Sequence, residues 1–149
     1  MGMFNTLLSG LFSKKPTAAE KKEINSILSR VTTCAKRLES TDSIDRYITE
    51  WDKYSADYER LRYYEDKKIK FTVSPQKIHE AICAEVPRIE KDVVTRGYDR
   101  MLRDAAKLST SKGKQNRAEK YFNELAFYYS RLQPETVNLI EQLKNSTTL

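Results

Sequence analysis

His79 is the residue of this sequence whose chemistry is simplest to assess, because the chain holds no second histidine. It opens the stretch HEAIC, in which Cys83 stands four residues further on. On a helix the two side chains share one face, and an imidazole and a thiolate at this spacing can bind zinc. No third ligand follows at a recognisable spacing, and Ile78, Ala81 and Ile82 surround the pair with residue types common in cores. We therefore predict no metal site here, but a histidine on a helix face beside a packed cysteine.

Catalytic patterns are equally scarce in the sequence. A serine or cysteine triad would need the same histidine, and no nucleophile elbow accompanies it. A loop that cradles phosphate needs clustered glycines, whereas the four glycines of the chain are scattered. Most carboxylates have a basic residue nearby in sequence, such as Asp42 with Arg46 and Glu59 with Arg62. We therefore predict that the protein is not an enzyme, and we predict no catalytic residue and no cofactor.

The basic residues raise the question of nucleic-acid binding. The net charge is +6, but acidic and basic residues alternate through most of the chain, which is typical of a solvated helix surface. Lys112, Lys114 and Arg117 cluster at the expected start of a helix, where side chains and free backbone N–H groups together could contact phosphate. A second basic cluster occupies residues 67–70. The two clusters support an alternative function, that of a nucleic-acid-associated accessory protein of the phage or mobile-element type.

The first fifteen residues, MGMFNTLLSGLFSKK, separate apolar from polar side chains completely if residues 3–12 are helical. The run is too short to span a membrane, and its lysines follow the apolar residues instead of preceding them as in a secretory leader. A helix this short is marginal alone in water, so the segment needs a surface to bind. The docking residues that we predict are Met3, Phe4, Leu7, Leu8, Leu11, Phe12, Lys14 and Lys15.

Four surfaces could order this segment: the protein's own core, a second copy of the chain, a membrane surface or another protein. At a membrane the apolar face would enter the acyl region while Lys14 and Lys15 would meet anionic headgroups. Gly2 and Thr6 also match the N-myristoylation pattern M-G-x-x-x-T, which has low specificity. The sequence leaves these alternatives open.

The composition and the spacing of apolar residues predict an all-α fold of about five helices, in a small bundle or stacked helical hairpins, preceded by the N-terminal amphipathic helix. Glycine and proline are few, with four of each, while 32% of residues are charged. Thr17 and Glu20 have the spacing of a capping box, which predicts a helix start. Two heptad-like seams joined by a short polar turn at residues 40–43 then predict an antiparallel helical hairpin. The seams are Ile24, Ile27, Val31, Cys34 and Leu38, and Ile44, Tyr47, Trp51, Tyr54, Tyr58 and Leu61.

The second half of the chain carries clear start and stop signals. Residues 67–76 break the helical period and predict an extended connector. A helix starts after Ser74, and Pro87 should kink or divide it. The polar stretch 109–116 predicts a turn before the next helix, and Pro134 predicts the start of a short final one.

Two further expectations concern side chains of the predicted helices. Cys34 and Cys83 lie in apolar-periodic segments without CxxC spacing, so we expect both thiols to be buried in a reducing cytosol.

Tyrosine hydroxyls need hydrogen-bond partners or water, so we expect the aromatic seam of the second helix to lie near an edge of the protein, where it is a candidate groove for a partner. The groove residues are Tyr47, Trp51, Tyr54 and Tyr58.

These patterns together predict a docking segment over residues 1–15, a single helical domain over 16–145 and a frayed tail over 146–149. We expect a cytoplasmic protein that acts as a non-catalytic adaptor or regulatory protein through protein–protein contact, with a peripheral location at the membrane as the alternative. A protein partner is the main expectation. A second copy of the chain, a membrane surface and nucleic acid are the other partners that the sequence allows.

Overall fold

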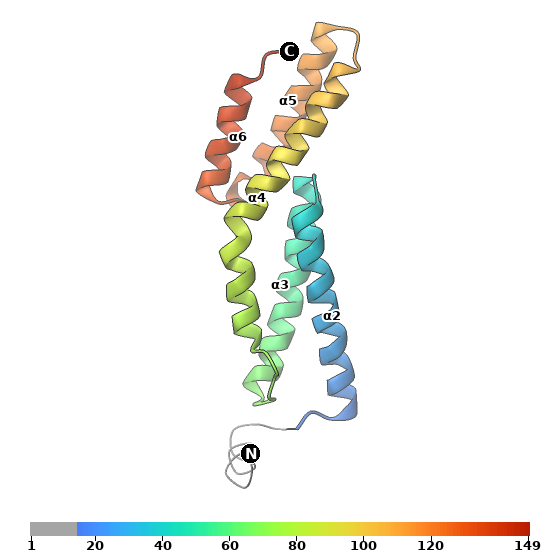
Figure 1. Cartoon of the computed structure of the whole chain (residues 1–149), viewed down its shortest axis with the longest axis vertical. Coiled ribbons are helices and arrows are strands. Elements are labelled where there is room, and N and C mark those ends of the chain that lie inside the picture. The colour runs from blue at the N-terminus through green and yellow to red at the C-terminus, as the bar shows by residue number, and fades with distance from the viewer. Residues whose placement is uncertain (1–14) are drawn as a thin grey trace. The chain divides into compact units, whose positions relative to one another are not determined.

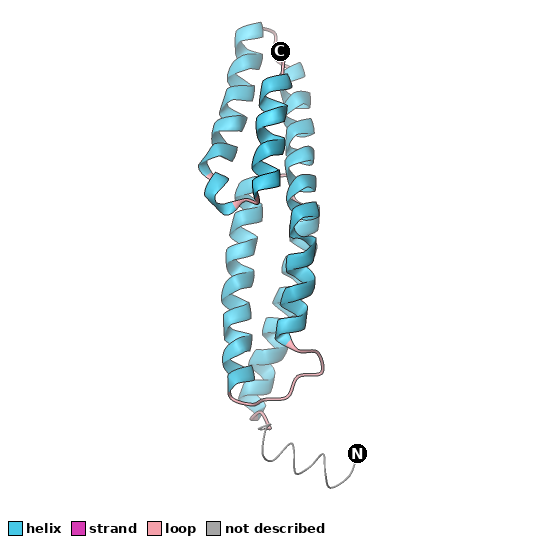
Figure 2. Cartoon of the chain, turned by 90° about the vertical axis from the view of Figure 1, so that its left-hand side faces the viewer, coloured by secondary structure: helices cyan, strands magenta, loops and turns pink. Residues whose placement is uncertain are grey.

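The structure, a computed structural model, describes residues 15–149. Within this range it contains five α-helices, one short 3₁₀ helix and no strand (Figures 1 and 2). The prediction of an all-α protein with five helices is therefore confirmed. The predicted amphipathic helix over residues 3–12 lies outside the described residues. The elements are α2 (Ala18–Ser40), α3 (Ile44–Asp66), α4 (Pro75–Ala106), α5 (Ser111–Phe127), η1 (Tyr129–Arg131) and α6 (Pro134–Ser146).

Helix α2 begins with the capping box that the sequence predicted. The backbone N–H of Thr17 donates to Glu20 Oε1 at 3.0 Å, and the N–H of Glu20 donates to Thr17 Oγ1 at 3.1 Å. Two of the N–H groups that a helix start leaves unpaired are thereby satisfied.

Helices α2 and α3 run antiparallel, as the ion pairs between them show. Arg30 Nη2 lies 2.9 Å from Asp57 Oδ1, and Arg60 Nε lies 2.6 Å from Glu23 Oε1. Residues late in one helix therefore face residues early in the other. Because three of these four side chains are about half exposed and water screens them, the pairs fix the register of the hairpin more than they add stability.

Helix α3 ends in a left-handed turn at Lys68, whose φ is 67°. The N–H of Ile69 donates to the carbonyl of Tyr64 at 3.2 Å, and the N–H of Lys68 donates to the carbonyl of Glu65 at 2.9 Å. These are the two bonds of a Schellman C-cap, and the side chain of Ile69 after it is buried. The chain then continues to α4 without forming a strand, as predicted.

Helix α4 continues through Pro87, so this proline does not divide the helix, and the alternative prediction that it kinks the helix stays a prediction. Proline removes the one N–H that would bond to the carbonyl of Cys83. Val86 and Ile89, on either side of Pro87, are both buried. Packing of these side chains outweighs the loss of one backbone hydrogen bond, since helices in proteins are held mainly by their buried face.

Helix α5 begins at Ser111, so the polar turn predicted over 109–116 is shorter than expected. Thr110 is the N-cap: its backbone is extended, and its Oγ1 accepts from the N–H of Gly113 at 3.0 Å. A side chain that satisfies a free N–H in this way lets a polar stretch start a helix.

The described chain divides into two compact units, each with its own core. Unit 1 comprises the chain up to Lys36 together with Trp51–Ala84, and unit 2 comprises Arg37–Glu50 and Glu85–Leu149. Helices α2, α3 and α4 contribute residues to both units. The buried apolar side chains of unit 1 include Ile24, Ile27, Val31, Cys34, Tyr54, Leu61, Tyr64 and Ile69. Those of unit 2 include Ile44, Tyr47, Ile48, Val86, Ile89, Val93, Val94, Met101, Phe122, Leu125 and Ile140.

Candidate functional site

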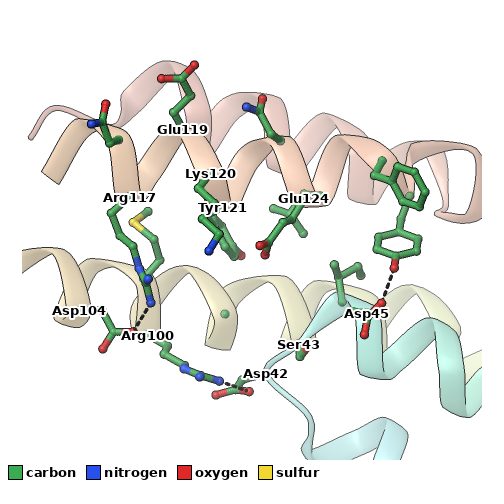
Figure 3. Close-up of a pocket in the computed structure, with 18 residues that line it drawn as sticks. Asp42, Ser43, Asp45, Arg100, Asp104, Arg117, Glu119, Lys120, Tyr121 and Glu124 are labelled. Atoms are coloured by element: carbon green, nitrogen blue, oxygen red, sulfur yellow. Dashed lines mark hydrogen bonds and ion pairs between the residues drawn. The ribbon is translucent and has the colours of Figure 1, made fainter. Parts of the chain in front are cut away.

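The candidate site is a cleft in unit 2 with a volume of about 1030 Å³, lined by α4, α5 and the start of α3 with the loop before it (Figure 3). Within the cleft, the backbone at Gly97 of α4 lies close to the backbone of Asp42: an added Cβ at Gly97 would lie 2.6 Å from the backbone oxygen of Asp42. A residue without a side chain is therefore required for this close approach. Beside it, the hydroxyl of Tyr121 donates to the carbonyl of Val94 at 3.1 Å. The charged residues that line the cleft are Asp42, Asp45, Arg100, Asp104, Arg117, Glu119, Lys120 and Glu124.

Two ion pairs neutralise much of the charge in one part of the cleft. Arg100 Nη1 lies 3.1 Å from Asp42 Oδ1, and Arg117 Nη2 lies 3.0 Å from Asp104 Oδ2. In Figure 3, Arg100 of α4 points toward Asp42 in the loop before α3, and Arg117 of α5 points toward Asp104 of α4. Because each charge already has a partner, this part of the cleft has little net charge to offer a ligand.

The other part of the cleft combines aromatic rings with carboxylates. Phe127 is 80% exposed, and its ring packs edge-on against Tyr128 with the centroids 5.0 Å apart. The hydroxyl of Tyr128 donates to the carboxylate of Asp45, and Figure 3 shows Glu124 projecting from α5 on the side that faces α4. The hydrogen bond to Asp45 raises the pKa of Tyr128, and the negative charge of Glu124 adds to this effect. We call Asp45, Glu124, Phe127 and Tyr128 the aromatic-acidic end of the cleft.

This arrangement suits a positively charged group. The face of an aromatic ring attracts a guanidinium or ammonium ion, and a neighbouring carboxylate can accept charge-assisted hydrogen bonds from the same ion. Sequence reasoning missed this end of the cleft. Glu124 and Phe127 lie on α5 and Tyr128 is its C-cap, whereas Asp45 lies at the start of α3, and no local motif joins Asp45 to the other three.

Glu90 is a second acidic residue that sequence reasoning missed, and it is only 1% exposed. Tyr47 donates to Glu90 Oε2 at 2.8 Å, while Thr136 Oγ1 and the backbone N–H of Gln133 donate to Oε1 at 2.7 and 2.9 Å. The carboxylate thus joins α3, α4 and the start of α6 within unit 2. One signal was available in the sequence: Glu90 follows Val86 by four residues and so interrupts the apolar face of its helix.

The predicted phosphate-contacting residues lie at the start of α5, as expected. Lys112 is exposed and Lys114 is partly buried, while Arg117 is bound to Asp104. Thr110 occupies one of the N–H groups that a phosphate would use at this helix start. The phosphate-binding role of Lys112, Lys114 and Arg117 stays a prediction.

Half of the predicted partner groove consists of buried side chains. Tyr47 and Tyr54 are 2% and 1% exposed, whereas Trp51 and Tyr58 are partly exposed. Tyr47 uses its hydroxyl within the fold, as described above for Glu90. A role of the four residues in partner binding stays a prediction, with Trp51 and Tyr58 as the members that a partner can reach.

The expectation that both cysteines are buried holds for Cys34 and is wrong for Cys83, which is exposed. In α4 the partly buried Ile78 and Ile82 share the inner face, and Cys83 lies beyond its border. The neighbouring His79 lies on the helix face as predicted, with Nε2 3.4 Å from Cys83 Sγ. Both thiols are free.

Three of the remaining expectations concern the membrane, metals and the N-terminal segment. None of the described helices combines the length and the apolar character that crossing a membrane requires. Across residues 15–149, no group of three or more histidine, cysteine, aspartate or glutamate side chains is arranged to hold a metal ion. Of the predicted docking residues, Lys15 is exposed, and the others lie outside the described range.

Comparison of the chain with protein-family models, with curated proteins and with solved structures returned no match. The function therefore has to be argued from the residues themselves and from their geometry.

Proposed function

We propose that the chain is a non-catalytic helical interaction protein whose cleft binds an arginine- or lysine-containing segment of a protein partner. The observation that carries this proposal is the 80% exposure of Phe127 next to the Tyr128–Asp45 pair. Aromatic side chains are enriched at protein interfaces and dominate their binding energy. Covering such an exposed ring with a partner removes apolar surface from water, which favours binding.

Charge determines which partner chemistry suits this end of the cleft. Asp45 and Glu124 are negative, and two of the three cationic residues that line the cleft, Arg100 and Arg117, are engaged in ion pairs elsewhere in it. An arginine side chain matches this environment better than a lysine, because its planar guanidinium can stack on a ring while donating two hydrogen bonds to a carboxylate.

Binding of a pair of labelled peptides tests the proposal. One peptide carries arginines in a glycine–serine frame, and the other carries citrulline, which is uncharged and of similar shape, at the same positions. Fluorescence anisotropy should detect binding of the arginine peptide, weakened by salt, and Phe127→Ala or Glu124→Gln should lower its affinity at least about fivefold. Val73→Ala and Glu59→Gln, at exposed positions in unit 1, are matched controls and should bind like the wild type. Equal binding of both peptides, or unchanged binding by both cleft variants, would contradict the proposal.

We also propose that the segment 3–12 docks the protein to a membrane surface. A partner protein is the alternative surface for the same segment. The motivation is the complete separation of its apolar and polar faces in the sequence, followed by Lys14 and Lys15. The wild-type chain should float with vesicles that contain anionic lipid. Leu7→Asp/Leu11→Asp should abolish flotation, while Ser9→Asp/Ser13→Asp adds the same charge to the polar face and should retain most of it. Absence of flotation by the wild-type chain would exclude the membrane and leave the protein's own core, a second copy of the chain or another protein as the surface that this segment contacts.

A further inference from the structure

Exposed basic residues gather in unit 1 where α3 ends and the loop to α4 begins. Residues 60–73 contain five basic and two acidic residues. One of the acids, Glu65, is partly buried and accepts a hydrogen bond from Ser74, while the other, Asp66, is exposed. All three lysines of the stretch are exposed, namely Lys67, Lys68 and Lys70. The surface therefore presents an excess of positive charge to solvent.

The same stretch exposes apolar and aromatic surface. Val73 is 54% exposed and Tyr63 is 42% exposed. Lys67 Nζ lies 4.5 Å from the centroid of the Tyr63 ring, and Arg60 Cζ lies 4.7 Å from it. Tyrosine and long basic side chains suit the boundary between lipid headgroups and acyl chains, because each joins an apolar body to a polar tip. We call Tyr63, Lys67, Lys68, Lys70 and Val73 the basic end of unit 1.

The basic end lies at the same end of unit 1 as the start of α2. Arg60, which contacts the Tyr63 ring, binds Glu23 of α2 with Nε 2.6 Å from Oε1. Figure 1 shows the start of α2 and the loop between α3 and α4 at this end. In the sequence, only two residues separate the segment 3–12 from Lys15, which is exposed just before α2. Docking of that segment to a membrane would therefore bring the basic end toward the same surface.

We propose that the basic end of unit 1 contacts the anionic headgroups of a membrane, as a second contact beside the segment 3–12. This inference rests on the membrane docking proposed for that segment. Stable anchoring of a protein takes two signals, such as one apolar anchor together with a basic patch. Each lysine close to an anionic lipid surface strengthens binding about fivefold, so three lysines supply a substantial second signal.

A nucleic acid fits the basic end less well than a membrane does. Single-stranded nucleic acids bind largely by stacking bases on aromatic rings, and the ring of Tyr63 is already contacted by two cations. Lysines contact phosphates in either partner. The exposed Val73 distinguishes the two, because a valine adds nothing to phosphate contacts but can enter the acyl region of a membrane.

Sedimentation of the full chain with vesicles of phosphatidylcholine containing about one third phosphatidylserine tests the inference. Replacing the three lysines of the basic end should weaken vesicle binding at least about tenfold, and this difference should vanish in high salt or on pure phosphatidylcholine. Replacing three lysines exposed elsewhere on the chain removes the same charge and should leave binding as in the wild type. The two variants are Lys67→Gln/Lys68→Gln/Lys70→Gln and Lys36→Gln/Lys91→Gln/Lys107→Gln.

The apolar part of the contact has its own variant. Val73→Ser should weaken vesicle binding about twofold to fivefold without changing its dependence on salt, because it removes apolar surface and no charge. Binding of a labelled single-stranded oligonucleotide should not respond to this change. If the lysine variant of the basic end lost oligonucleotide binding but kept full vesicle binding, the surface would recognise nucleic acid and the inference would be overturned.

The remaining outcomes separate this inference from the docking proposed for the segment 3–12. Equal vesicle binding by the two lysine variants, with loss of binding in Leu7→Asp/Leu11→Asp, would overturn the inference and leave the docking segment in place. Wild-type binding by Leu7→Asp/Leu11→Asp, with loss in the variant of the basic end, would instead leave the basic end as the membrane contact. Absence of vesicle binding by the wild-type chain would overturn both.

Discussion

Glu90 and Glu124 are both acidic residues of unit 2, yet their surroundings are opposite. Glu90 is 1% exposed and accepts hydrogen bonds from Tyr47, Thr136 and the backbone of Gln133. Glu124 is exposed at the aromatic-acidic end of the cleft. A buried carboxylate is tolerated only when its oxygens are satisfied inside the protein, so Glu90 is committed to the fold. Glu124 is available to a ligand.

Glu23 in unit 1 is intermediate between these two. Its carboxylate binds Arg60 at 2.6 Å and accepts a hydrogen bond from Tyr64, but it remains in contact with water. The three acids show that burial and hydrogen-bond partners together decide whether a carboxylate holds the fold together or remains available to a ligand. Variants of each should therefore differ in how much stability they remove.

The largest effect is expected at Glu90. Replacement by alanine leaves three donors without their acceptor, so Glu90→Ala should lower the free energy of unfolding by about 2–4 kcal/mol in urea titrations. Asp99→Ala, an exposed acid on the same helix, is the matched control and should stay within about 0.5 kcal/mol of the wild type. A change below about 1 kcal/mol for Glu90→Ala would mean that the carboxylate does not hold α3, α4 and α6 together.

A smaller, pH-dependent effect is expected at Glu23. Hydrogen bonds from Arg60 and Tyr64 lower its pKa from the ordinary value of 4.5 to about 2. A carboxyl whose pKa is lower in the folded state adds stability above its unfolded pKa and loses that contribution as pH falls toward the folded pKa. The stability advantage of wild type over Glu23→Gln should therefore be full above about pH 5 and shrink toward pH 2.

Urea midpoints of both proteins between pH 2 and 6 measure this difference. Glu59→Gln changes an exposed acid of the same unit and should follow the wild-type pH profile. A difference between wild type and Glu23→Gln that does not vary with pH would show that Glu23 titrates normally in the folded protein.

Much of the fold could be predicted because its signals are local. The capping box at Thr17, the apolar seams of α2 and α3, and the start of α4 after Ser74 each depend on residues within one or two helical turns. Two departures from the predicted helix boundaries, the continuation of α4 through Pro87 and the early start of α5, arose where tertiary packing or one capping side chain outweighed a local preference.

The candidate sites were harder to predict because each depends on residues from different helices. The approach of Asp45 to Tyr128 joins positions 83 residues apart, and that of Tyr47 to Glu90 joins positions 43 apart. The periodicity of apolar residues predicts which face of a helix is buried, but it does not predict which residues of another helix contact that face. His79 and Cys83 could be placed on one helix face from the sequence because they are four residues apart, but the hydrogen bond between His79 and Tyr54 could not be predicted.

Of the three acidic residues, Glu124 should change stability least when it is replaced, and it should change binding of the arginine peptide most. Glu124→Gln should alter the free energy of unfolding by less than about 0.5 kcal/mol, because the side chain is exposed. A loss of binding in this variant therefore cannot be attributed to unfolding.

The most direct test of the proposed function is the ratio of the Kd values for the citrulline and arginine peptides, measured on wild type and on Glu124→Gln. We predict that wild type binds the arginine peptide at least about tenfold more tightly, and that the ratio falls toward one in Glu124→Gln. A ratio near one on wild type would contradict the account, because the aromatic-acidic end would then not recognise positive charge.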